Sequence, residues 1–149
     1  MLDDVYNAKI LEFAGNIPRS GRLDAPDASA KAHSKLCGST LTVDICVDDN
    51  SITDYAHDVK ACALGQSSAS IVATSIIGAS LDEMRALKTT MYAMLKKGGP
   101  APEGRFADLS YLMPVRDYGA RHASTLLVFD AIVDALDQID AKKKAEAAA

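Results

Sequence analysis

The sequence has no long apolar run, no cluster of basic residues and only three cysteines. No stretch approaches the roughly 20 consecutive apolar residues of a membrane helix, so we expect no membrane partner. The 16 Lys and Arg residues are scattered and the net charge is -4, which argues against nucleic acid as a partner. The first residues, MLDDVYNAKILEFAG, begin with acids, whereas an export signal begins with basic residues. We therefore expect a reducing, cytoplasmic environment, in which thiols serve as ligands, nucleophiles or core residues.

Recognisable motifs of nucleotide-binding proteins and hydrolases are missing as well. The chain contains no Walker motif, no GxGxxG motif and no Ser-His-Asp pattern. It also lacks internal repeats and any linker long enough to separate two domains. A chain of 149 residues with 48% apolar composition is long enough to bury one sizeable core. We therefore expect a single domain over residues 1–149.

Periodic patterns in the first half of the chain predict one helix and three strands. Apolar residues recur at helical spacing over residues 5–13. A first strand is expected to end around residue 36. Strict alternation over residues 41–47 is typical of a half-buried strand, and residues 52–61 carry strand-forming residues again.

The second half of the chain predicts three helices. The first begins beyond Gly65 and ends at Gly78 as a left-handed cap. The second begins at a capping pair, Ser80 with Glu83, and the third runs from His122 into the alanine-rich tail. Residues 106–115 have no clear pattern. This order predicts an α+β fold: a three-stranded antiparallel sheet with an N-terminal helix and three following helices packed on one face.

Two of the cysteines flank the predicted hairpin. If Asp49 and Asn50 are the central turn residues, residues facing each other have numbers that sum to 99, as do Cys37 and Cys62. Directly opposite Cβ atoms lie about 4.5–5.5 Å apart, close enough for two thiolates to share one metal ion. The alternative is that both thiols pack as small apolar groups, and the shared register makes the metal-site hypothesis the stronger one.

The remaining candidate residues have less support. Cys46 lies on the strand face of Thr42 and Asp44, away from the proposed site, which indicates a structural role. His33 and His57 have no neighbouring ligand in the pattern. They are therefore not included in the predicted site.

Three segments, LCGSTLTVDICVDD, KACALGQSSAS and ARHASTLLVFDAI, resemble the U-type scaffolds of iron–sulfur cluster assembly, which are related to the N-terminal domain of NifU. The resemblance implies an α+β domain that gathers three cysteines and an aspartate at one end of the sheet. Such proteins receive sulfur from a cysteine desulfurase, assemble a [2Fe–2S] cluster or hold zinc, and pass the cluster to recipient proteins. Thiolates suit this task as soft ligands for iron and zinc.

The chain departs from the family pattern at two positions. Ser39 stands where the family has an aspartate after Cys-Gly, and Ala123 stands in place of the third cysteine. The neighbouring His122 matches a histidine that many members carry. The resemblance therefore implies Cys37, Cys62 and His122 as ligands of iron, a [2Fe–2S] cluster or zinc, with one coordination position open. The family's chaperone motif, Pro-Pro-Val-Lys, has only MPVR as a remote counterpart, so we do not expect that partner.

Three hypotheses about function remain open at this point. The first is a non-enzymatic scaffold or metal-binding assembly factor that accepts sulfur from a cysteine desulfurase. The second is a zinc-dependent sulfur acceptor that activates such a desulfurase. The third is a degenerate, metal-free interaction protein, which the missing cysteine at Ala123 favours and the retained thiols disfavour.

Overall fold

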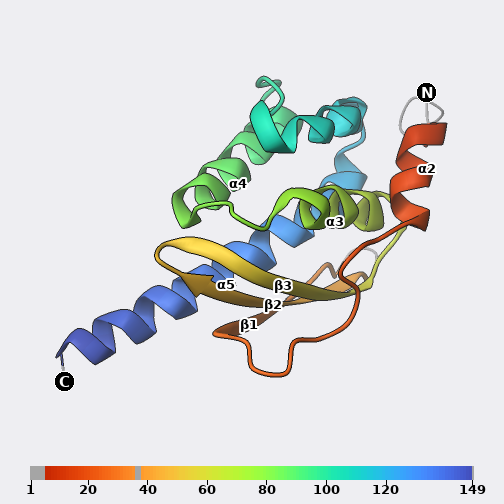
Figure 1. Cartoon of the computed structure of the whole chain (residues 1–149). Coiled ribbons are helices and arrows are strands. Elements are labelled where there is room, and N and C mark those ends of the chain that lie inside the picture. The colour runs from red at the N-terminus through yellow and green to blue at the C-terminus, as the bar shows by residue number, and fades with distance from the viewer. Residues whose placement is uncertain (1–5, 36–37, 149) are drawn as a thin grey trace.

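The computed structural model describes residues 6–35 and 38–148 and shows a small sheet covered on one side by helices (Figure 1). The predicted α+β fold is confirmed. Among the helices of the described chain, none combines the length and the apolarity that crossing a bilayer requires. The elements in chain order are α2 (Ala8–Gly15), β1 (Ala28–His33), β2 (Thr40–Asp48), β3 (Ser51–Lys60), α3 (Ala63–Ser75), α4 (Leu81–Lys96), η1 (Gly104–Asp117), η2 (Gly119–Arg121) and α5 (His122–Ala148).

The sheet is antiparallel, with β2 between β1 and β3. Leu41, Val43 and Ile45 of β2 are buried on one face, as their alternation predicts. On this face α5 packs against β1 and β2, and α3 packs against β3. Helix α4 packs on α5, while α2 packs on α3. Helices α3 and α5 therefore form the layer next to the sheet, and α2 and α4 lie on them.

The turn between β2 and β3 has the predicted chemistry. Asp49 and Asn50 have φ values of 49° and 64°, the left-handed pair of a two-residue hairpin turn. Asp48 faces Ser51 as predicted, but an irregularity between Cys46 and Val47 shifts the register by one residue. The predicted register therefore holds from the turn to the pair Val47 and Ile52 and is off by one residue beyond it, because a β-bulge places two residues of one strand opposite one of the other.

Two helical segments differ from their predictions. Helix α3 ends at Ser75, and Gly78, with φ of 90°, lies in the turn beyond it rather than capping it. The segment predicted to be irregular forms 3₁₀ turns, η1. Its buried residues are spaced by three, which matches the three residues per turn of a 3₁₀-helix. These residues are Phe106, Leu109, Leu112 and Val115.

The chain between α2 and β1 crosses the other face of the sheet (Figure 1). It first runs along the edge of β3, where His57 N donates to Arg19 O at 3.1 Å and Gly21 N donates to His57 O at 2.9 Å. The His57 ring is buried, with Nε2 2.8 Å from Pro18 O. These contacts cover an edge strand whose backbone groups would otherwise be available to another chain.

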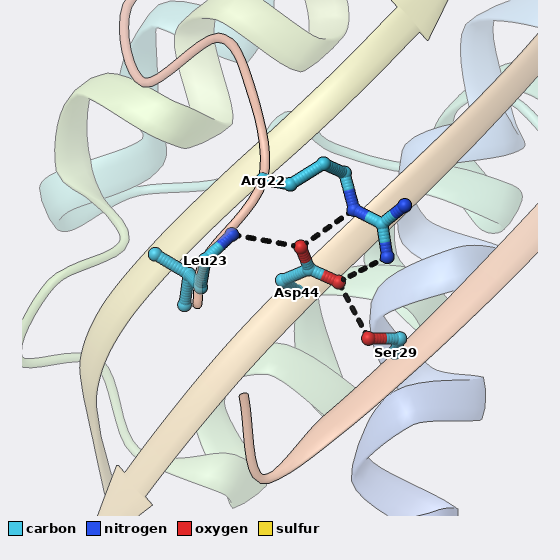
Figure 2. Close-up of polar contacts among 4 residues, drawn as sticks. All are labelled: Arg22, Leu23, Ser29 and Asp44. Atoms are coloured by element: carbon cyan, nitrogen blue, oxygen red, sulfur yellow. Dashed lines mark hydrogen bonds and ion pairs between the residues drawn. The ribbon is translucent and has the colours of Figure 1, made fainter. Parts of the chain in front are cut away.

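The crossing segment is then anchored at Asp44 of β2, whose carboxylate is 0% exposed (Figure 2). Arg22 donates two hydrogen bonds to it, from Nε at 2.7 Å and Nη2 at 3.0 Å. Leu23 N donates at 2.9 Å, and the hydroxyl of Ser29 on β1 donates as well. Burial alone would raise the pKa of Asp44, but these hydrogen bonds hold the pKa below its usual range. The polar face of β2 therefore fixes the path of the chain into β1.

Candidate functional site

Cys62 lies at the N-terminus of α3, where it is the N-cap residue. Its carbonyl accepts the first helical bond from Gln66 N at 2.9 Å, and its side chain makes no capping bond. The thiol is unoxidised and half-buried. Helix α3 thus begins at Ala63, directly after Cys62, which is earlier than the predicted start beyond Gly65. This end of a helix presents unpaired backbone N–H groups, which favour electron-rich ligands nearby.

The head of α5 lies against the head of α3 and reaches the Cys62 sulfur. The thiol donates a hydrogen bond to Ser124 Oγ, with 3.3 Å between sulfur and oxygen. Gly65 permits this approach: a Cβ there would lie 3.1 Å from the backbone oxygen of Ser124 and 2.8 Å from the Cβ of Ala61. Two residues that are 62 positions apart in the sequence thus meet at one point of the domain.

His122, the first residue of α5, is 7% exposed. Its Nε2 lies 3.0 Å from Val115 O and 3.1 Å from Arg116 O. Carbonyl oxygens only accept, so Nε2 carries the proton and donates to the end of η1. Only Nδ1 is then left to coordinate a metal. Metal-bound histidines commonly donate their other ring nitrogen to a carbonyl in this way, so the contacts fit a ligand role as well as a structural one.

The third predicted ligand, Cys37, lies outside the described residues. Its neighbour Gly38 has a φ of 72°, and Gly38 N donates to Ser34 O at 2.8 Å. Ser39 is 3% exposed. Within residues 6–35 and 38–148, no three His, Cys, Asp or Glu side chains form a group that could hold a metal ion. The distance between the sulfurs of Cys37 and Cys62 stays a prediction.

Ala123, which stands in place of the family's third cysteine, is exposed between two buried neighbours. Those neighbours are His122 and Ser124. A thiol at Ala123 would be accessible from solvent. The structure therefore places His122 and Ser124 at the head of α5, with Cys62 in contact with the second of them.

Residues that were excluded from the predicted site lie elsewhere in the structure. Cys46 on β2 is half-buried, and its sulfur donates to Ala25 O at 3.6 Å. His33 is exposed on the last position of β1. His57 is buried at the edge of β3, where its Nε2 lies 2.8 Å from Pro18 O, and this burial lowers its pKa.

Ser124 is the neighbour of Cys62 that sequence analysis missed. The only signal was its place in RHAST, two residues after the candidate ligand His122. Residues at that spacing lie on different sides of a helix. The contact with Cys62 depends on how α3 and α5 pack, which the local sequence does not reveal.

Comparisons with known proteins agree with this architecture. Residues 5–125 match the model of the NifU-like N-terminal domain. The iron–sulfur cluster assembly scaffold protein IscU of Thermotoga maritima is 25% identical over 135 residues, which cover 91% of this chain and 94% of that protein. The protein of the same name from Streptococcus pyogenes is 22% identical and covers 91% and 84%.

Solved structures show the same fold. The crystal structure of a nitrogen-fixing NifU-like protein (N-terminal) from Brucella abortus has a TM-score of 0.93 and 62% identity, covering 95% of this chain and 98% of that one. A protein described as a SUF-system scaffold for iron–sulfur clusters, from Fervidobacterium islandicum, has a TM-score of 0.83 at 20% identity, covering 90% and 98%. The second likeness shows the fold alone. Because the family model spans most of its length, this chain belongs to the NifU-like N-terminal domain family.

Proposed function

We propose that this protein is a scaffold for iron–sulfur cluster assembly. In this role it receives sulfur from a cysteine desulfurase and holds iron or a [2Fe–2S] cluster at Cys37, Cys62 and His122. It then passes the cluster to recipient proteins. Support comes from its family and from relatives that carry the name of such scaffolds. The single observation that carries the proposal is the accessible Cys62 thiol at the junction of the α3 and α5 heads.

Sulfur transfer needs only a thiolate that can reach the desulfurase persulfide. A cysteine of the scaffold, as thiolate, attacks the outer sulfur of the persulfide. A new S–S bond forms on the scaffold, the old S–S bond breaks, and its electron pair leaves on the desulfurase cysteine. Cys62 suits this role because it is half-buried rather than enclosed. His122 would add a nitrogen donor through Nδ1, since its Nε2 is engaged by two carbonyls.

A zinc-dependent sulfur acceptor is the second candidate. Two thiolates and one imidazole are a common zinc donor set that leaves a fourth position for water or a partner's side chain. A zinc site of this kind needs only two thiolates, whereas a [2Fe–2S] cluster is usually held by four. The two candidates share their ligands and differ in the metal.

The test is anaerobic incubation of the protein with a cysteine desulfurase, free cysteine and ferrous iron, followed by analysis of iron, zinc and acid-labile sulfide. The scaffold hypothesis predicts that iron and sulfide bind together in similar amounts. Zinc with a persulfide but no acid-labile sulfide would support the second candidate. Protein that binds neither metal nor sulfur would contradict both candidates.

A further inference from the structure

We propose that Ser124 is a positioning residue for the Cys62 sulfur. Its hydroxyl accepts a hydrogen bond from the thiol in the metal-free protein and donates one to the sulfur when Cys62 holds a metal ion. The inference rests on the proposed function, because it concerns the metal-bound form of Cys62. The inference gives Ser124 a role at the site, which neither the family description nor the names of the relatives assign to it.

The contact must reverse when metal binds. In the structure the Cys62 thiol is the donor and Ser124 Oγ, 3.3 Å away, is the acceptor. A cysteine that coordinates a metal has lost its proton and acts only as an acceptor. Ser124 is 3% exposed, so water has little access to replace the lost partner. The hydroxyl therefore has to donate to the sulfur, or the contact is lost.

The Ser124 hydroxyl donates only a weak hydrogen bond in its present orientation, so it can rotate toward the Cys62 sulfur. It donates to Arg121 O at 3.3 Å, which is long for a hydrogen bond between two oxygens, where about 2.7–2.8 Å is usual. The same carbonyl also accepts from Thr125 Oγ1 at 2.9 Å. Arg121 O thus keeps a good partner when Ser124 turns away. The larger radius of sulfur makes 3.3 Å an ordinary length for a bond from O–H to sulfur.

Hydrogen bonds to ligand atoms orient the ligand and change its electron density. Their loss typically lowers metal affinity by about 10- to 100-fold. A donor to sulfur also withdraws electron density from it, which moves sulfur-to-metal charge transfer to higher energy. Ser124 should therefore raise metal affinity and shift this absorption band.

Cobalt(II) is a suitable probe, because it takes tetrahedral thiolate sites and shows a sulfur-to-cobalt charge-transfer band. We expect Ser124→Ala to weaken cobalt binding by about 10-fold and to move the band to lower energy. Ser124→Thr keeps the hydroxyl, so its cobalt affinity and its band energy should match those of the wild-type protein. The matched control is Ser68→Ala, which removes a buried hydroxyl that bonds Thr125 O at 2.8 Å between the same two helices without bonding Cys62. It should leave the affinity and the band unchanged.

The outcomes separate the inference from the proposed function. A band that Cys62→Ala abolishes but Ser124→Ala leaves unchanged would overturn the inference and leave the proposed function standing. Equal effects of Ser124→Ala and Ser68→Ala, without rescue by Ser124→Thr, would reduce Ser124 to a packing role and also overturn it. A wild-type protein without any sulfur–cobalt band would overturn both. If circular dichroism shows that Ser124→Ala does not fold, Ser124→Thr and Ser124→Val make the same comparison, because they share a shape and differ in the hydroxyl.

Discussion

The polar clusters around Asp44 and Cys62 differ in the exposure and the hydrogen bonding of their central side chains. The Asp44 carboxylate is 0% exposed and accepts hydrogen bonds from Arg22, Leu23 and Ser29. The Cys62 sulfur is half-buried, and its hydrogen-bond partner within the described part of the chain is Ser124, at 3.3 Å. A carboxylate with every lone pair occupied fixes the backbone and has nothing left for a ligand. A half-buried sulfur that bonds a neutral hydroxyl stays available for metal or sulfur chemistry.

Removing the Asp44 carboxylate should have the largest effect on stability. Asp44→Ala breaks the hydrogen bonds from exposed Arg22 and leaves the half-buried donors of Leu23 and Ser29 without their acceptor. Breaking such a network typically costs about 2–4 kcal/mol in the free energy of unfolding. Urea unfolding measures this change. Asp58→Ala is the control: Asp58 of β3 is exposed on the same face of the sheet and should change stability by less than about 0.5 kcal/mol. Equal losses for both variants would show that the Asp44 cluster does not anchor the chain.

Gly65→Ala should damage the Cys62 cluster by separating the two helix heads. The added Cβ would lie 2.8 Å from the Cβ of Ala61 and 3.1 Å from Ser124 O, so we expect a loss of about 1–3 kcal/mol and lower iron occupancy. Gly15→Ala is the control, since a Cβ there meets no atom within 4 Å. An alanine at Gly65 that keeps wild-type stability and iron would contradict the close approach of α3 and α5.

Acid should weaken the chain crossing in two separate steps. Burial lowers the pKa of His57 and hydrogen bonds lower that of Asp44. A lowered folded-state pKa gives stability that is complete above the unfolded value and is lost as the pH falls through the folded value. The His57 step therefore begins below about pH 6.5 and the Asp44 step below about pH 3.9.

His57→Gln should abolish the first step, whereas His33→Gln should not, because His33 is exposed. The first step should appear as a fall in the free energy of unfolding of the wild-type protein that His57→Gln lacks. Urea unfolding at a series of pH values between these limits measures it. The same pH dependence in wild type and His57→Gln would rule out His57 as its cause.

Introducing the family's cysteine at Ala123 should have the smallest effect on the fold. It tests whether Ala123 faces the Cys62 cluster. Ala123 is exposed on the first turn of α5, so Ala123→Cys should cost less than about 1 kcal/mol. A further thiolate should slow the loss of a reconstituted cluster in air, followed by visible absorbance. Ala120→Cys, an exposed position in η2, should not. Identical decay rates for all three proteins would show that Ala123 does not face the site.

Local sequence signals predicted the elements but not their exact pairing. Two predicted features depend on neighbouring residues alone. One is the hairpin turn at Asp49 and Asn50. The other is the N-cap at Ser80, whose hydroxyl accepts a hydrogen bond from Glu83 N at 3.0 Å. The bulge at Cys46 and Val47 depends on how the sheet packs. The 3₁₀ segment was missed because its buried residues are three apart, a spacing that fits neither a regular α-helix nor a strand.

Contacts between distant segments were out of reach of the sequence. Arg22 lies in a segment without periodicity, so nothing in the sequence pairs it with Asp44, 22 residues away. Ser124 likewise meets Cys62 only because Gly65 lets two helices approach closely. Cys37 and Cys62 were paired from the predicted hairpin register, and His122 was added from the resemblance to a family. Cys62 and His122 lie at the two helix heads that meet, whereas their pairing with Cys37 stays a prediction.

The central claim is that the Cys62 end of the domain, and not the thiol at Cys46, holds the metal. The most direct measurement is the iron and sulfide content of Cys62→Ala and Cys46→Ala after anaerobic reconstitution, with Cys37→Ala alongside. We expect Cys62→Ala and Cys37→Ala to lose most of the bound metal, because each removes a thiolate ligand. Cys46→Ala should keep it, because that sulfur contacts Ala25 O on the other side of the sheet. Equal losses from all three substitutions, or no loss from Cys62→Ala, would contradict this account.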